Sequence, residues 1–536
     1  MSERVGVRAL APSLEKAPNR SFSLNDGVLV AGFLAAAVGA CLDFEFLGLG
    51  VSQTHRLYCF FWIAVLVFFD REGHPRSRFA LTISLFAFNL LYGDLLRHYA
   101  PEAQSRRDCL KLLAFSPSPW LWLAALWFAT PVLLDRRGVR YGKVFRLSLI
   151  ALCSFGAQSF ASTISSRNPL RSLSEFSEDL GLYLALLIPW FRAALSCEPV
   201  RHKFARGLNL IIGSLLLVSG LAGLFFVFGS ETLRETMVRA GVLFREASPD
   251  PTLPRLRLIF PMQNFNRTAY LGLAGILMLL LGALRPRLGT GRRWETLAVA
   301  PGALVIFLTS TRGAVAALGA ALVFWGLLSS RRFLVLLVAG TLGVFVLLPT
   351  SRREHFLSVL SVATYHPEPG RVTSMSLRLK GWETGLLIVR ENLWWGLGYG
   401  PKVLEQVYPR YGVRTGDFES KPHLHNVWLE YAAESGVLAA LAFLIWTLLR
   451  WSLLWGAYRG AADRATSRYF AGWLAVEVSL FLFGLFFFML RRNFGLLTWI
   501  IWAMALCEAE AQRPGRNGME TEGATSRDAR SRQTTP

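Results

Sequence analysis

Long apolar runs recur along almost the whole chain, and they constrain the fold more than any other feature of the sequence. About 20 apolar residues are enough for a helix to cross the hydrocarbon core of a membrane. The runs that could span, or nearly span, cover residues 27–47, 57–69, 79–96, 119–134, 144–164, 179–195, 207–229, 268–284, 295–309, 313–329, 333–349, 427–449, 469–490 and 494–507. The sequence therefore predicts an all-α, polytopic integral membrane protein with about 12–14 transmembrane helices.

The distribution of basic residues accounts for the net charge of +21 and indicates how the helices are oriented. Most basic residues stand in short clusters between apolar runs, which is typical of cytoplasmic loops and not of a nucleic-acid-binding face. If the polar N-terminal tail, residues 1–26, is cytoplasmic, the two long polar loops 230–267 and 350–424 both face outward. They would lie in the periplasm if the cell has two membranes. Arg491 and Arg492 then also lie outside, against the positive-inside rule.

The cysteines are scattered, with no spacing that would build a metal site or a disulfide framework. No clear cleavage site follows the polar N-terminal tail, so the first apolar run is expected to serve as an uncleaved anchor.

A polar, histidine-bearing segment runs directly into an apolar helix that is expected to begin near Val427. His425 would then lie about one turn outside the hydrocarbon. Imidazole has an ordinary pKa of roughly 6.5, so it can take or give a proton near neutrality. His425 is therefore a candidate for proton transfer on a lipid-borne substrate; the alternative is a merely polar residue at a helix start. If the helix already includes this turn, His423 points some 200° away, and only one ring can face a site.

Two further groups of polar residues lie at the outer ends of predicted helices. Arg312, in the tight turn Thr309–Gly313, is costly at that depth unless it meets an anion or carbonyl groups, with a snorkelling side chain as the alternative. At the start of an earlier helix, Asn264, Asn266 and Arg267 could bind sugar hydroxyls or phosphate, or simply cap the helix.

The outward loop 350–424 contains a predicted amphipathic helix over Ser376–Asn392, for which Ser374 or Ser376 is available as a cap. Its apolar face comprises Leu379, Trp382, Leu386 and Val389. We expect this helix to lie on the membrane or on the helix bundle. It is followed by Trp394–Gly400, whose aromatic residues suit the membrane interface and whose glycines permit a tight turn.

Four of these pieces together resemble the O-antigen ligase and polymerase superfamily of bacterial membrane glycosyltransferases. They are Asn264–Leu271, Ser310–Ala314, Arg378–Trp382 followed by Asn392–Gly400, and His425–Glu430 with Gly436 eleven residues after the histidine. The resemblance covers about residues 260–450. Transmembrane helices are expected on both sides of it, in 27–259 and 451–507, and a disordered cytoplasmic tail in 508–536.

The resemblance implies transfer of a glycan from undecaprenyl pyrophosphate to an acceptor hydroxyl, of a saccharide or of lipid A-core, at the outer face of the inner membrane. It implies no metal, nucleotide or other cofactor. His425 would act as general base while arginine side chains bind the leaving pyrophosphate. The candidate substrate-binding residues are Arg312, Arg378, Arg267, Asn266 and Asn426. Glu430 and Glu434 are expected to orient the helix or His425.

Several functions remain open. Within the family, the enzyme could be a ligase that delivers finished polymer, a polymerase that joins repeat units, or a transferase to protein. A polytopic transporter or channel for a small anionic solute is the alternative from another class. Few mid-membrane charges and no evident inverted repeat speak against it.

Overall fold

The computed structural model describes residues 141–181, 198–239, 242–245, 256–260, 264–285, 292–330, 350–357, 374–411 and 423–513, with single residues in 183–195 and 332–346. The four apolar runs predicted before residue 141, most of 179–195 and most of 333–349 lie outside the described residues.

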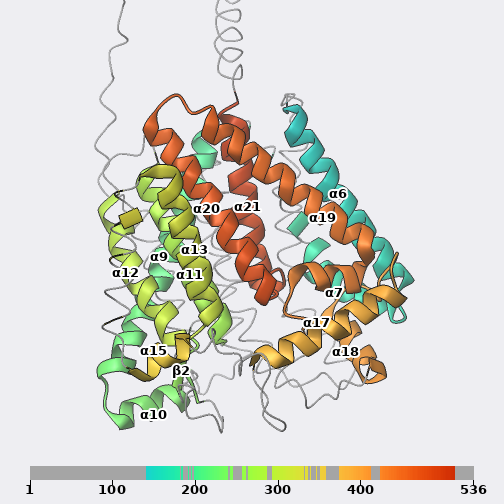
Figure 1. The fold of residues 1–536 in the computed structure, drawn as a ribbon, viewed down its shortest axis with the longest axis horizontal. Coiled ribbons are helices and arrows are strands. Elements are labelled where there is room, and N and C mark those ends of the chain that lie inside the picture. Colours follow the sequence, from blue (N-terminus) through green and yellow to red (C-terminus); the bar gives the residue numbers. More distant parts are fainter. Residues whose placement is uncertain are drawn as a thin grey trace, which may run out of the picture.

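The described chain forms a bundle of long helices (Figure 1). They are α6 (Lys143–Ser165), α9 (Glu198–Phe228), α11 (Phe265–Leu284), α12 (Arg292–Thr309), α13 (Arg312–Ser329), α19 (Val427–Arg459), α20 (Arg464–Phe486) and α21 (Arg492–Ala511). Among the described residues, six helices are long and apolar enough to cross a membrane. The predicted class of all-α, polytopic membrane protein is confirmed.

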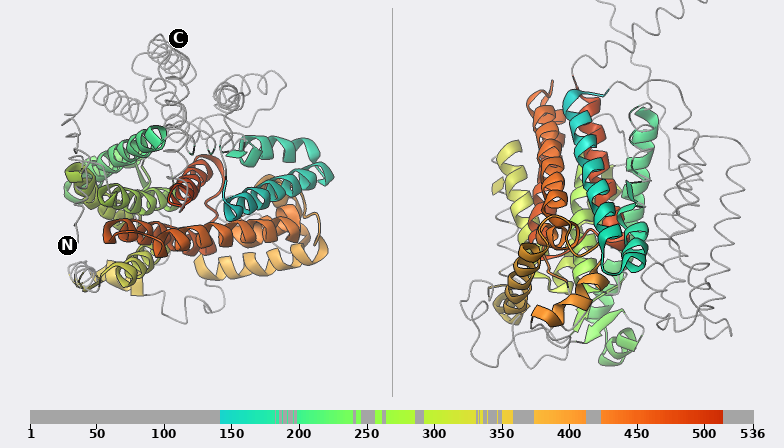
Figure 2. Two further views of the ribbon diagram at one scale, coloured as in Figure 1. Left: turned by 90° about the horizontal axis from the view of Figure 1, so that it is seen from above. Right: turned by 90° about the vertical axis from the view of Figure 1, so that its right-hand side faces the viewer.

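The short elements gather at one end of this bundle, away from the turn that joins α19 to α20 (Figures 1 and 2). They are α7 (Pro169–Glu178), α10 (Glu231–Arg239), α15 (Thr350–Leu357), α17 (Ser374–Glu391), α18 (Pro401–Val407), the 3-10 helix η3 (Tyr408–Tyr411), and an antiparallel hairpin of β1 (Leu243–Arg245) and β2 (Leu256–Leu258). The described parts of the two long polar loops therefore share one side of the bundle, as the alternating basic clusters predict.

α11 packs against α9, α12, α13 and α20 in the core. Glycines allow this close approach. A Cβ atom on Gly272 would lie 2.7 Å from the Ile306 side chain, and one on Gly275 would lie 2.7 Å from Leu216. Small residues at such contacts are typical of helix packing in membranes, where backbones approach closely.

A buried ion pair joins α19 to α20 inside the bundle. Arg450 is 1% exposed, and its Nε and Nη2 atoms donate to the two carboxylate oxygens of Glu477 over 2.7 and 2.8 Å. The guanidinium also lies 4.2 and 4.3 Å from the ring centres of Trp446 and Trp502. Paired charge and flanking aromatic rings make burial of this arginine tolerable.

The observed helices follow the predicted apolar runs, but α9 begins nine residues before the run 207–229 and α19 continues ten residues past the run 427–449. α17 begins at Ser374, so neither Ser374 nor Ser376 stands before the helix as its cap. Its predicted apolar face is wrong at Leu386, which is 61% exposed, because small Gly385 faces the bundle and packs on Leu429 instead. α21 continues to Ala511, four residues past its predicted end, and buries Glu508 and Glu510.

Candidate functional site

A helix cap at Asn426 fixes the segment before α19. The Asn426 side chain accepts hydrogen bonds from the backbone N–H groups of Trp428 and Leu429 over 3.0 and 3.1 Å, so the helix begins at Val427 as predicted. A side-chain oxygen at this position satisfies N–H groups that have no partner within the helix. Asn426 thus has a defined structural role, and its role in substrate binding stays a prediction.

His425 is held in an unusual backbone conformation directly before the cap. Its φ is +53°, a left-handed conformation that is uncommon for residues other than glycine. Such strain persists only where the surrounding structure enforces it, and it often marks functional sites. Burial in the first place, and then the nearby Arg378 and His423, lower the pKa of His425 to about 3. The imidazole is therefore neutral across the physiological range.

Arg378 lies near this histidine, and Arg312 from a distant element lies near Arg378. Arg312 is the first residue of α13. It comes two residues after Ser310, whose φ is +54°. Burial lowers the pKa of Arg378, in the first turns of α17, to about 10, and repulsion by Arg312 adds to this. An anion bound between the two guanidinium groups would offset this repulsion. Arg378 thus lies near both Arg312 and His425, and these are three of the residues to which the sequence assigns chemistry.

Asn266 and Arg267 lie in the first turn of α11, directly after the residue that caps this helix. The Asn264 side chain accepts their backbone N–H groups over 3.0 and 3.2 Å. For Asn264, the capping alternative is therefore the observed one. Both following residues are half-buried at the end of the bundle that carries α17 and α18. Their part in binding stays a prediction.

α19 is not one continuous helix, because Gly436 breaks it with φ +84° and ψ 167°. Trp428 and Phe443 show how sharp the bend is. Their ring centres are 5.0 Å apart, whereas 15 residues of straight helix would separate them by about 22 Å. Residues 427–435 therefore form a short helix at the end of the bundle, and residues 437–459 form the long one.

The glycine-rich segment after α17 fills this break. The N–H groups of Leu397 and Gly398 donate to the carbonyls of Ala433 and Glu434 over 3.0 and 2.9 Å, and the N–H of Val437 donates to Leu393 over 2.8 Å. These bonds satisfy backbone groups that the break would leave without partners. The predicted tight turn is confirmed, with positive φ angles at Gly396, Gly398 and Gly400.

Serines of α6 and α7 fix the same segment from the other side. Ser162 donates to the carbonyl of Glu434 over 2.6 Å, and Ser172 donates to that of Tyr399 over 2.8 Å. The break, the glycine-rich segment and the start of α7 therefore form one connected unit.

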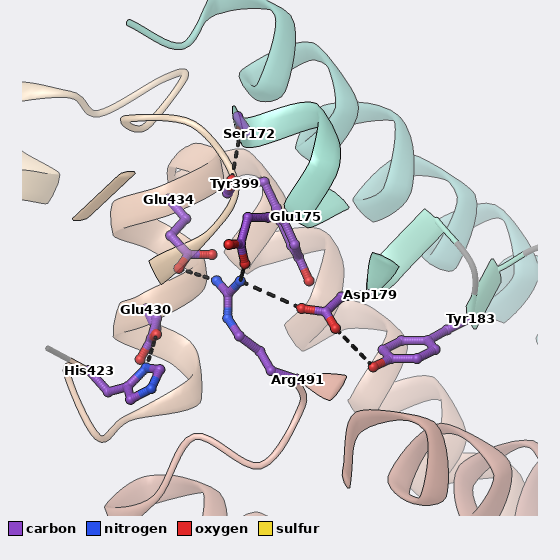
Figure 3. Close-up of polar contacts among 9 residues, drawn as sticks. All are labelled: Ser172, Glu175, Asp179, Tyr183, Tyr399, His423, Glu430, Glu434 and Arg491. Atoms are coloured by element: carbon purple, nitrogen blue, oxygen red, sulfur yellow. Dashed lines mark hydrogen bonds and ion pairs between the residues drawn. The ribbon is translucent and has the colours of Figure 1, made fainter. Parts of the chain in front are cut away.

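Arg491, the residue before α21, is the centre of a buried network of charges (Figure 3). It forms an ion pair with Glu434 and lies 3.9 Å from Glu175 and 3.8 Å from Asp179, both on or directly after α7. Burial alone would lower the pKa of Arg491, but Glu434 and other groups around it raise the pKa above its usual value. The guanidinium therefore stays charged.

A second carboxylate of the short helix binds a histidine. Oε1 of Glu430 and Nδ1 of His423 are 3.2 Å apart and form a hydrogen bond (Figure 3). Glu430 and Glu434 were both expected to orient the helix or His425. In the structure, Glu430 contacts His423 and Glu434 contacts Arg491.

The structure also removes the geometric basis for choosing between the two histidines. That choice assumed that the helix already includes His423 and His425, but the helix begins two residues after His425. The two rings lie 6.3 Å apart and nearly perpendicular to each other. Both histidines therefore belong to one local cluster.

Sequence reasoning missed Arg491, Glu175 and Asp179. The available signal was Arg491 with Arg492, because a basic pair in an outward loop violates the positive-inside rule. An arginine that breaks this rule is tolerated where carboxylates surround it, as they do here.

Residues 297–444 match the family model described as O-antigen ligase. Over this stretch the chain is similar to the O-antigen ligase family. The matched region runs from α12 to the first part of α19, so it includes Arg312, Arg378 and His425. The resemblance to the O-antigen ligase and polymerase superfamily is confirmed, and activity of the ligase or polymerase type follows in general terms. No curated protein matches the chain.

Proposed function

We propose that this protein transfers a glycan from undecaprenyl pyrophosphate to an acceptor hydroxyl, at the periplasmic face of a bacterial inner membrane. One observation supports this beyond the family match. Arg312, Arg378 and His425 come from three separate elements and lie close enough to interact electrostatically. A pair of guanidinium groups beside a neutral imidazole suits a reaction that releases a polyanion and consumes a hydroxyl proton.

The arginines act on the leaving group. When the bond between the anomeric carbon and the pyrophosphate oxygen breaks, the electron pair stays on that oxygen and adds negative charge. Arg312 and Arg378 supply fixed positive charge at this point, and the planar guanidinium can donate two parallel hydrogen bonds to a phosphate. No metal or other cofactor takes part in the proposed reaction.

His425 acts on the acceptor. Its pKa of about 3 keeps the imidazole neutral, so a nitrogen lone pair is available to accept the proton of the attacking hydroxyl. A base with such a low pKa can accept the proton only as the pKa of the hydroxyl falls in the transition state. Proton transfer would thus coincide with formation of the new glycosidic bond.

The proposed catalytic region is residues 260–450, with transmembrane helices on both sides. The donor is a lipid-linked glycan, and the acceptor is a saccharide or lipid A-core. Surrounding membrane lipids are further partners, and nucleic acid has no part in this function.

The test is transfer by the purified full-length protein in proteoliposomes that contain an undecaprenyl pyrophosphate-linked oligosaccharide, supplied with candidate acceptors. We expect His425→Ala to fold and insert, to leave the lipid-linked donor unconsumed, and to lose on the order of 10²–10⁴ in rate, as removal of a general base does. Gln406→Ala, an exposed change on α18, is the control and should transfer normally. Undiminished transfer by His425→Ala would exclude the proposed base.

A further inference from the structure

His423 and Glu430 form a hydrogen-bonded pair next to the proposed base, and the reaction described above gives this pair no role. Their contact spans seven residues and joins the segment before α19 to its first turn (Figure 3). The Glu430 side chain is fully buried, at 0% exposure, whereas that of His423 is 29% exposed. One member therefore lies in the protein interior and the other reaches the solvent.

The contact is suited to holding a proton. When it is ionised, the Glu430 carboxylate can orient the His423 ring through Nδ1 and stabilise a positive charge on it. Phe488 lies against the His423 ring at 6.4 Å between ring centres and limits its motion. His425 has no comparable support, since its Nδ1 is buried without a hydrogen bond in the described part of the chain.

The charges around the pair are mixed. Arg491 and Glu434 act on Glu430 from the side of the ion network, and Tyr408 of η3 lies near the same carboxylate. His425 faces His423, with Arg378 behind it. Arg378 opposes arrival of a proton on His425, whereas the Glu430 carboxylate favours a proton on His423. A proton therefore moves downhill from His425 to His423.

We propose that His423 and Glu430 form a dyad that takes the acceptor's proton from His425 and passes it to water. The inference rests on the proposed function. The acceptor oxygen forms the glycosidic bond, its O–H bond breaks, and the proton goes to His425. The electron pair of the broken anomeric bond leaves with the pyrophosphate. The proton then moves to His423, across a ring separation of 6.3 Å that one water molecule can bridge, and His425 returns to its neutral form.

His423 and Glu430 are thus positioning residues that act through His425. Without the dyad, the proton has to stay on a buried imidazole near the Arg378 guanidinium. The proton-transfer step should slow, whereas binding of the lipid-linked donor should not change. This separates the dyad from a purely structural contact, because loss of folding would lower the amount of active protein and leave the pH profile of the remainder unchanged.

The experiment measures kcat and KM for the donor as a function of pH with the full-length protein in proteoliposomes. We expect Glu430→Gln to lower kcat on the order of 10²-fold with unchanged KM. The acid limb of its kcat profile should move to lower pH, because the amide no longer stabilises the His423 imidazolium. Glu383→Gln, which removes an exposed carboxylate of α17, should match the wild type in kcat and in profile.

A second variant covers the case in which Glu430→Gln does not fold. His423→Ala should be slow, and added imidazole should restore part of its rate, since the position reaches solvent. Wild-type kcat and pH profile in Glu430→Gln, or no response of His423→Ala to imidazole, would overturn the dyad. Different results would contradict the proposed function itself. These are a wild-type protein that makes no product, or a His425→Ala variant that remains fully active.

Discussion

Arg491 forms an ion pair with Glu434, two residues before the point at which Gly436 breaks α19. Glu175 and Asp179 lie on the other side of the same guanidinium, at 3.9 and 3.8 Å. One side chain therefore links the start of α21, the short helix that carries Glu430, and α7. This link sets where the short helix sits relative to the bundle, and with it the position of the residues immediately before Val427.

Arg491→Ala should destabilise the protein severely. Removing one partner of a buried ion pair leaves an uncompensated charge and typically costs about 3–5 kcal/mol. Here Glu434 would remain fully buried, with two further carboxylates close by. Thermal unfolding of the purified protein in detergent measures the effect. Arg459→Ala, at the exposed end of α19, should unfold like the wild type, and equal midpoints for both variants would contradict the structural role of Arg491.

Gly436→Ala should prevent correct folding of the site. At φ +84° a side chain is strained, and the new Cβ atom would collide with the backbone carbonyl of Trp394. Gly456→Ala lies on the same helix with no atom within 4 Å of the added methyl group. It should be neutral or stabilise by up to about 1 kcal/mol, since alanine is the better helix former. The yield of monodisperse protein in detergent compares the two, and equal yields would mean that the break tolerates a side chain.

Much of the bundle follows from local sequence signals. Val427 begins a helix because Asn426 offers a capping oxygen and an apolar run follows. The turn at Trp394–Gly400 follows from its glycines. The break at Gly436 could not be predicted, because a lone glycine inside an apolar run usually continues as helix, and only the distant Leu393–Gly398 segment satisfies the freed backbone groups.

The candidate site was predictable in its residues but not in its contacts. Resemblance to a known family selected Arg312, Arg378 and His425, and the structure places them near one another. The partner of His423 depends on how the short helix is oriented, which periodicity cannot show. Glu175 and Asp179 carry no signal at all, because a carboxylate near the end of a helix looks like any other polar residue until a distant arginine contacts it.

Both long polar loops should be accessible from the outer side of the membrane. α10 and α17 lie at the same end of the bundle, opposite the turn that follows α19 (Figure 1). In a cysteine-free background, Thr236→Cys and Lys380→Cys, both at exposed positions, should react with an impermeant thiol reagent added outside intact cells or spheroplasts. Gly460→Cys should react only after permeabilisation. Labelling of Gly460→Cys from outside, with protection of the other two, would reverse the predicted orientation.

Arg378→Lys should abolish most of the transfer activity while the protein remains folded. Lysine keeps the positive charge, but a single ammonium group cannot donate two parallel hydrogen bonds to a phosphate. A lysine also loses its proton more easily than an arginine does. Both burial and the repulsion by Arg312 favour the neutral form of a basic side chain at this position. The matched control is Arg390→Lys, the same exchange at an exposed position of α17. The rate of product formation at equal protein level should fall for the first variant alone, with a normal thermal unfolding midpoint in both. Near wild-type transfer by Arg378→Lys would reduce Arg378 to a source of unspecific positive charge.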